Sequence, residues 1–210
     1  KEINMVTDDS RLHQWVLFQK TLFDRHPAKY PTYGTIEAVK SFSRKQVADY
    51  YYSHYIPNNM IISIVGNAKN AREAVQKYFG RLKPGKLIKR PNVTEPAQAK
   101  IKEFIEKKKT LNSYMVLGYK TVARMHKDSY VFEVITAILG RGQSGWMFDE
   151  IRNKRGLAYQ VGVNNERESD YGLFAVYMGL DKTKIEDVKQ IILQQFRRLE
   201  KTSKKDLEEA

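Results

Sequence analysis

Apolar residues recur at helical spacing in several stretches of the chain. This periodicity predicts helices over residues 10–24, 36–42, 44–55, 68–79, 129–139 and 183–199, because side chains three or four positions apart share one helix face. The helix over 129–139 is apolar enough to be mostly buried, and the one over 183–199 is amphipathic. Ser43 and Gln46 have the spacing of a capping box, and Ser203 has the position of a further N-cap.

Short apolar or alternating runs predict the strands. Residues 60–66 (MIISIVG) are rich in β-branched side chains and predict a buried strand, whereas IKEFIEK (101–107) alternates between apolar and polar positions. Three further strands are predicted at SYMVLGYKT (113–121), YQVGV (159–163) and YGLFAVYMGL (171–180), the last two as antiparallel neighbours. The fold class that follows is α+β, with antiparallel sheets and helices packed on one face.

Residues 82–99 are rich in Pro and Lys and carry no periodicity, so they predict a linker. The 210 residues, of which 41% are hydrophobic, suffice for one large domain or two small ones. No apolar run approaches the roughly 20 residues of a membrane helix, so we expect no membrane span. Because Lys1 is not Met and the helix after Ser203 stops at Ala210, we expect both ends to be cuts through a longer protein.

The formal net charge of +13 is unevenly distributed. Residues 81–109 contain ten Lys or Arg and three Asp or Glu, and so contribute seven of the thirteen charges. Nucleic acid or an acidic membrane would be one partner for such a stretch. The run has several prolines but few interleaved aromatic residues, which favours a solvated linker. We therefore expect no nucleic-acid partner.

The most informative stretch is IRNKRGLAY (151–159). It places Arg152 near the end of a helix, Gly156 at its stop and Tyr159 at the start of a strand. The guanidinium fork donates several hydrogen bonds and the phenol adds one, so the two side chains could bind an oxyanion. Favourable interaction of Arg152 with the helix dipole and the preference of Tyr for strands would explain the same residues without any function.

Other candidate sites have simpler explanations. The chain has no cysteine, and none of its four histidines pairs with a His or carboxylate at the spacing of helical metal ligands. The glycine-rich GRGQSG (140–145) lacks the Lys-Ser/Thr of a phosphate-binding loop and predicts a bend between two helices. The tyrosines at 50, 51, 52 and 55 could stack bases, but they also suit the packing of a helix.

Three motifs resemble one known family. HPAKYPTYGT (26–35) with YIPNNM (55–60) and the glycine at 66, the run LGRGQSGWMFDEIRNKRGLAYQV (139–161), and KEINM (1–5) are similar to motifs of the pitrilysin/insulinase zinc peptidases, which include the mitochondrial processing peptidase. Arg141 stands where that family often has a glycine, and Trp146 replaces a common polar residue. These departures affect the shape of a loop more than its chemistry.

The resemblance implies two similar α+β halves that close like a clam around an unfolded peptide. Residues 1–95 would be the second part of the first half, and residues 96–210 the first part of the next. Arg152 and Tyr159 match the pair that binds the substrate carbonyl and the oxyanion, and Glu2 matches a distant zinc ligand. The inverted motif His-x-x-Glu-His is missing from this chain. Zinc is thus implied for the intact enzyme, with none necessarily bound here.

The function implied is zinc-dependent cleavage of unfolded peptides, and the isolated chain is expected to be inactive. The alternative is a homologue that keeps the fold without zinc and serves as a peptide-binding or partner subunit. By analogy alone, a homodimer or a heterodimer with a homologous subunit is a candidate assembly.

Overall fold

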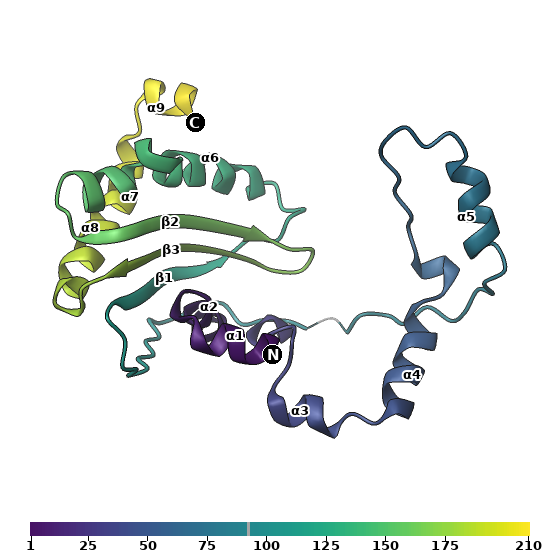
Figure 1. The fold of residues 1–210 in the computed structure, drawn as a ribbon. Helices are drawn as coiled ribbons and strands as arrows, with labels where there is room; N and C mark the ends of the chain where they lie inside the picture. Colours follow the sequence, from purple (N-terminus) through teal and green to yellow (C-terminus); the bar gives the residue numbers. More distant parts are fainter. Residues whose placement is uncertain (92) are drawn as a thin grey trace. The chain divides into compact units, whose positions relative to one another are not determined.

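The computed structural model describes residues 1–91 and 93–210. The chain divides into two compact units, Lys1–Tyr33 together with Thr94–Ala210 (unit 1) and Gly34–Val93 (unit 2) (Figure 1). The division at Val93/Thr94 falls inside the predicted linker 82–99, of which Asn92 lies outside the described residues. The assignment of 1–95 and 96–210 to two similar halves stays a prediction.

Unit 1 is built on a three-stranded antiparallel sheet. Its order is β1-β3-β2, with β1 at Ser113–Thr121, β2 at Ala158–Arg167 and β3 at Gly172–Leu180. The predicted hairpin of β2 and β3 is confirmed, with Val163 opposite Val176. Because β3 is central and has side chains buried on both sides, its sequence is a nearly continuous apolar run.

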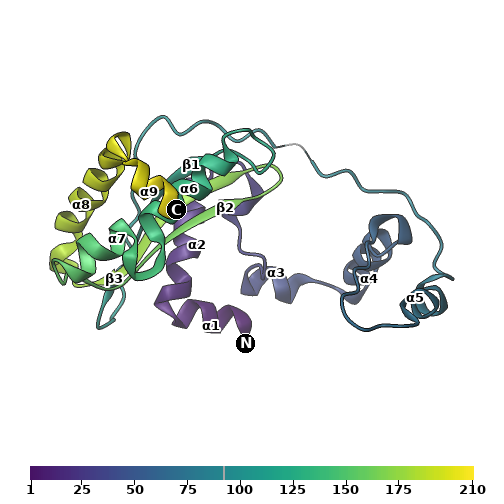
Figure 2. The same cartoon turned by 90° about the horizontal axis from the view of Figure 1, so that it is seen from above.

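Helices cover both faces of this sheet. On one face α6 (Ser129–Gly140), α7 (Trp146–Phe148) and α8 (Ile185–Arg198) enclose the larger core, and Figure 2 shows α6 and α7 overlying the strands. This core includes Leu139, Met147, Ile151, Phe174, Val176, Met178, Leu180, Val188 and Ile192. The short helix α9 (Lys204–Glu209) begins at Ser203, whose predicted N-cap is confirmed by a capping box with Asp206. The α+β class with an antiparallel sheet is confirmed, but the expectation of helices on one face alone is wrong, because the N-terminal segment packs on the other face as well.

The opposite face of the sheet is covered by the N-terminal helices. Helix α2 (Ser10–Leu22) follows α1 (Glu2–Asp8), and both lie below the sheet in Figure 1. A second core joins Leu22 and Phe23 to Leu173 and Ala175 of β3. Alternate residues of a strand point to opposite faces, so β3 contributes to both cores. The segment that begins the chain is therefore packed on strands more than a hundred positions later.

Unit 2 contains the helices α3 (Ile36–Ser41), α4 (Arg44–His54) and α5 (Ala71–Phe79). The capping box of Ser43 and Gln46 at the start of α4 is confirmed. After α4, Asn58 donates to and accepts from the backbone of Gly85, at 2.8 and 3.0 Å. A Cβ on Gly85 would lie 2.9 Å from Ile56, so glycine permits this close approach.

Three predictions for individual segments are also wrong. Residues 60–66 form no strand, and Ile61 and Val65 are 98% and 97% exposed. Residues 101–107 also form no strand. Both segments have strand-like composition, but neither has a hydrogen-bonded partner strand among the described residues, and a strand exists only as part of a sheet. Helix α6 is not mostly buried, because Tyr130 and Val131 point to solvent.

None of the helices in the described ranges combines the length and the apolar character needed to cross a membrane.

Candidate functional site

Residues 146–160 form the helix–turn–strand reversal that the sequence predicts. Helix α7 continues as a π-helical turn over Asp149–Asn153, in which the Lys154 N–H donates to the Asp149 carbonyl at 2.9 Å. Single π turns inside helices are frequent at functional sites. Ile151 is fully buried in the larger core, which anchors this turn and directs its neighbour Arg152 outward.

Gly156 ends the helix in the left-handed conformation, with φ of +61°. Its N–H donates to the Arg152 carbonyl at 3.0 Å, and the Leu157 N–H donates to the Ile151 carbonyl at 2.9 Å. These bonds satisfy carbonyls that the helix end would otherwise leave unpaired. Nothing lies within 4 Å of a Cβ built on Gly156, so glycine is needed here for backbone conformation and not for space.

Tyr159 lies in a β-bulge at the start of β2. The register with β3 shifts between Ala158 and Gln160, so Tyr159 has no opposite residue. A bulge of this kind re-aims a side chain, and the Tyr159 side chain is 70% exposed while Ala158 is buried. The reversal thus presents both predicted residues to solvent, on either side of Gly156.

The arginines around the reversal have different partners. The Arg152 guanidinium lies over the Phe148 ring, 5.0 Å from its centroid. Arg155 instead pairs with the Glu150 carboxylate, which also pairs with Lys154 at 2.6 Å. Hydrogen bonds from those two cations hold the pKa of Glu150 below its usual value. In the described part of the chain the Arg152 guanidinium contacts the Phe148 ring, while the Glu150 carboxylate pairs with Lys154 and Arg155, so the N–H donors of Arg152 remain available to a ligand.

Glu2 occupies the first turn of α1, where a carboxylate is favourable for the helix dipole. It is exposed. Burial and then the charge of Glu2 raise the pKa of Tyr33. The assignment of Glu2 as a zinc ligand stays a prediction.

The histidines have structural partners. His13 lies 3.1 Å from Glu106, and the buried His26 lies 3.4 Å from Asp170 while its Nδ1 accepts the Ala28 N–H. Across residues 1–91 and 93–210 no three His, Cys, Asp or Glu side chains form a group that could hold a metal ion. The residues present therefore do not make a zinc site by themselves.

The remaining sequence candidates are local structure. The segment 140–145 is a bend with a single 3-10 turn at Gly142–Ser144, as predicted, between α6 and α7. On α4, Tyr50 stacks on His54 with ring centroids 3.9 Å apart, and Tyr51 stacks on Tyr55 at 4.6 Å. These rings pack against one another along the helix.

One polar centre has no counterpart in the sequence patterns. Glu95 is largely buried and accepts three backbone N–H groups as well as Lys120. It lies in the Pro- and Lys-rich stretch, where no periodicity marks it, and its partners come from distant positions.

Known proteins match this chain over most of its length. Residues 41–210 match the family described as the peptidase M16 inactive domain. An uncharacterized zinc protease of Streptomyces coelicolor is 30% identical over 200 residues, which cover 91% of this chain and 43% of that protein. The chain therefore spans less than half the length of this relative.

Solved structures agree in fold. A protease from Helicobacter pylori superposes with a TM-score of 0.89 at 25% identity, covering 97% of this chain and 51% of that one. A peptidase M16 inactive domain from Pseudomonas fluorescens superposes with a TM-score of 0.75 at 19% identity. The superposition covers 98% of this chain and 50% of the Pseudomonas chain.

Proposed function

The chain belongs to the M16 peptidase family, through the part described as its inactive domain, and we propose that it supplies the substrate-side portion of a zinc-dependent endopeptidase acting on unfolded peptides. Family membership confirms the resemblance to the pitrilysin/insulinase peptidases. Relatives named zinc proteases support the proposed activity. Because the chain spans only 43% of such a relative, this activity is proposed for the intact protein and not for the chain alone.

The exposed pair on the helix–turn–strand reversal is the observation that carries the proposal. Each of the two side chains follows a buried residue that directs it to solvent: Arg152 follows Ile151, and Tyr159 follows Ala158. Together they would donate hydrogen bonds to a peptide carbonyl and hold the negative charge that develops on its oxygen when the carbon becomes tetrahedral. Removing one such donor typically lowers the rate by about 10²–10³.

Zinc belongs to this proposal only for the intact enzyme. A catalytic zinc is commonly held by three protein ligands, and this chain offers Glu2 as a single candidate. We propose that the other ligands come from a part of the intact protein that corresponds to the portion of the relatives outside the match. We also propose that residues 1–95 and 96–210 belong to two similar halves. The substrate would then lie between a metal side that includes Glu2 and a clamp side with Arg152 and Tyr159.

The test uses paired variants in the intact, zinc-loaded protein. Arg152→Gln and Tyr159→Phe are expected to lower kcat/KM for an unfolded peptide by about 10²–10³. Arg155→Gln is the matched control for the first, since Arg155 is paired with Glu150. Tyr130→Phe is the control for the second, since Tyr130 is equally exposed, on α6. Unchanged hydrolysis in both Arg152→Gln and Tyr159→Phe would show that the pair does not act on the substrate.

A second candidate is a non-catalytic subunit that binds peptides or a homologous partner as a homodimer or heterodimer. The description of the matched domain as inactive favours it. Peptide binding without hydrolysis in the zinc-supplemented intact protein would select this function, and turnover would select the peptidase.

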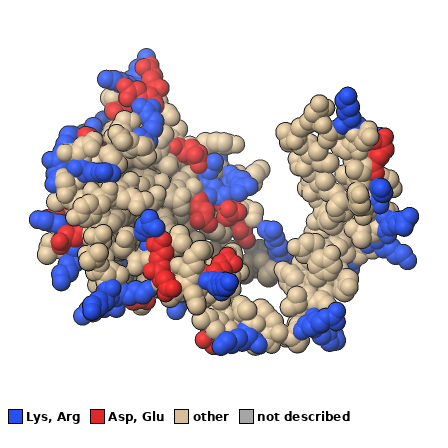
Figure 3. Space-filling model, viewed as in Figure 1, with Lys and Arg blue, Asp and Glu red and all other residues tan. Residues whose placement is uncertain are grey.

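Nucleic acid is not part of either proposal. On the face drawn in Figure 3, acidic side chains lie among the Lys and Arg of unit 1, and the basic residues form no single continuous stripe there. Strong DNA retention at low salt that is lost steeply as salt rises would contradict this assignment.

A further inference from the structure

Residues 95–108, here called the strap, run antiparallel to the N-terminal helices. Four contacts define the path: Glu95 with the backbone of residues 24–26, Lys102 with Asp24 at 2.7 Å, Glu106 with His13 at 3.1 Å, and Lys108 with the Thr7 carbonyl. As numbers rise along the strap, those of its partners fall toward α1. The strap therefore follows α2 and reaches the helix that carries Glu2.

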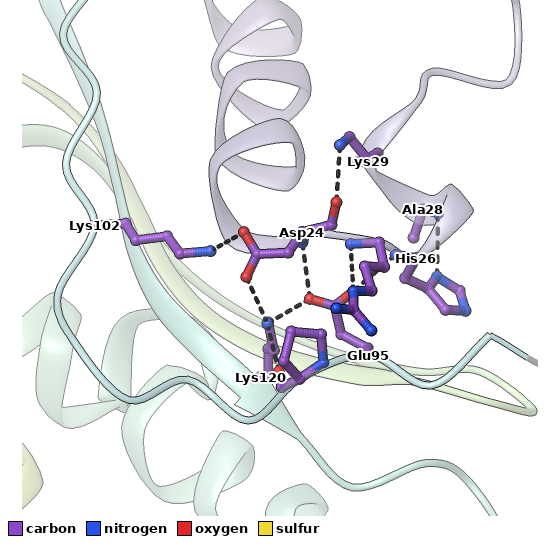
Figure 4. A network of polar contacts seen from close by, with 9 residues as sticks. Asp24, His26, Ala28, Lys29, Glu95, Lys102 and Lys120 are labelled. Atoms are coloured by element: carbon purple, nitrogen blue, oxygen red, sulfur yellow. Dashed lines mark hydrogen bonds and ion pairs between the residues drawn. The ribbon is translucent and has the colours of Figure 1, made fainter.

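Glu95 is the most highly coordinated point of the strap (Figure 4). Its Oε1 accepts the Asp24 N–H at 2.8 Å, and its Oε2 accepts the N–H groups of Arg25 at 2.8 Å and His26 at 2.7 Å. Successive backbone N–H groups that converge in this way form a concave site for an anion. The Glu95 side chain is 12% exposed, so these bonds are shielded from water.

Lys120 extends the contact to the sheet. Its Nζ donates to Glu95 and to the Pro96 carbonyl and lies 3.9 Å from the Asp24 carboxylate. Because Lys120 belongs to β1, a single carboxylate joins the end of α2, the strap and the sheet. Burial alone would raise the pKa of Glu95, but the three N–H donors and Lys120 lower it to about 2. The carboxylate is thus charged throughout the physiological range.

The chemistry of this site requires a carboxylate. Each carboxylate oxygen of Glu95 accepts two hydrogen bonds. A glutamine has the same shape, but its NH₂ group is itself a donor and would face two N–H donors without accepting from them. The apolar contacts of Leu22 and Phe23 also hold α2 on the sheet. Apolar attraction is non-directional, however, whereas charge-assisted hydrogen bonds define one register.

We infer that Glu95 is a positioning residue, which fixes the helix pair α1–α2, and with it Glu2, at one register on the sheet whose β2 strand carries Tyr159. This inference rests on the proposed function for the roles of Glu2 and Tyr159. Both residues belong to unit 1, so Glu95 would set the metal side and the clamp side of the site relative to each other. It does so without contacting either.

Amide hydrogen exchange of the chain tests the structural part of this inference. Glu95→Gln is expected to speed exchange in residues 2–26 by about tenfold or more, the effect of losing one charge-assisted hydrogen bond, while β2 and β3 stay protected. Glu95→Asp keeps the charge and should restore part of the protection. The matched control is Glu103→Gln, because Glu103 is a 59%-exposed strap residue whose partner Lys189 lies on α8. Unchanged exchange in Glu95→Gln would overturn the inference.

Kinetics of the intact, zinc-loaded protein test the positioning part. Glu95→Gln should lower kcat at least about tenfold, as expected when reacting groups are displaced, with KM within about twofold and partial recovery in Glu95→Asp. If Arg152→Gln lowers hydrolysis while Glu95→Gln does not, the inference fails and the proposed function stands. If Glu95→Gln loosens residues 2–26 while Arg152→Gln and Tyr159→Phe leave hydrolysis unchanged, the proposed function fails. In that case Glu95 still fixes the helices.

Discussion

Glu95→Gln should make the stability of unit 1 less dependent on pH. The folded-state pKa of Glu95 lies at about 2, against an ordinary value of 4.5. Each pH unit between these values corresponds to about 1.4 kcal/mol, so the ionised carboxylate stabilises the folded state by about 3 kcal/mol. Because the folded pKa is the lower one, this stabilisation is complete above pH 4.5 and is lost as the pH falls toward 2.

Urea unfolding followed by tryptophan fluorescence measures this effect. Trp15 on α2 and Trp146 on α7 both report on unit 1. Glu95→Gln should lower the free energy of unfolding by about 3 kcal/mol at pH 7 and by only about 1 kcal/mol at pH 3. The control Glu103→Gln should stay within about 0.5 kcal/mol at both values, since exposed ion pairs contribute little. An equal loss at pH 7 and pH 3 would refute the electrostatic explanation and indicate altered packing instead.

Other variants test the structure around the site and the cores. Gly156→Ala should destabilise unit 1 by about 1–2 kcal/mol in urea unfolding, because alanine is strained at φ of +61° although space is open; no loss would mean that the turn relaxes. Phe174→Ala should cost about 3–5 kcal/mol by the same assay, since this ring is fully buried against other aromatic rings. A smaller cost would indicate that the core collapses into the space. Ser43→Ala should reduce the stability of α4 by about 1 kcal/mol, measured by circular dichroism and exchange in unit 2, through loss of its cap. Tyr159→Phe should change stability by less than about 0.5 kcal/mol, so a larger change would contradict the exposed position of its hydroxyl.

Much of the reversal could be predicted because its determinants are adjacent in the chain. The apolar Ile151 beside Arg152, the glycine at 156 and the strand onset predicted at 159, one residue after its observed start, are local signals. The π-helical turn and the bulge at Tyr159 were not predictable in this way. Both depend on how α7 and β2 fit over the larger core, and together they determine that the two side chains are exposed.

The failed strand predictions have the opposite origin. Residues 60–66 and 101–107 have the composition of strands, but a strand depends on backbone groups elsewhere that complete its hydrogen bonds. The second of these segments became part of the strap, where side-chain contacts to His13 of α2 and to Asp24 just after this helix replace a ladder. Alternation in a sequence indicates an extended backbone and cannot identify the partner.

The sequence by itself determined most of the helices, the capping box at Ser43, the N-cap at Ser203, the β2–β3 hairpin and the turn at Gly156, because these depend on residues within a few positions of one another. Only the tertiary structure decided that β1 pairs with β3, that α2 covers the second face of the sheet and that Glu95 finds its donors at residues 24–26. Those contacts join positions about 50 to 160 residues apart. Their energy comes from burial and from charge-assisted bonds that exist only once the distant segments have met.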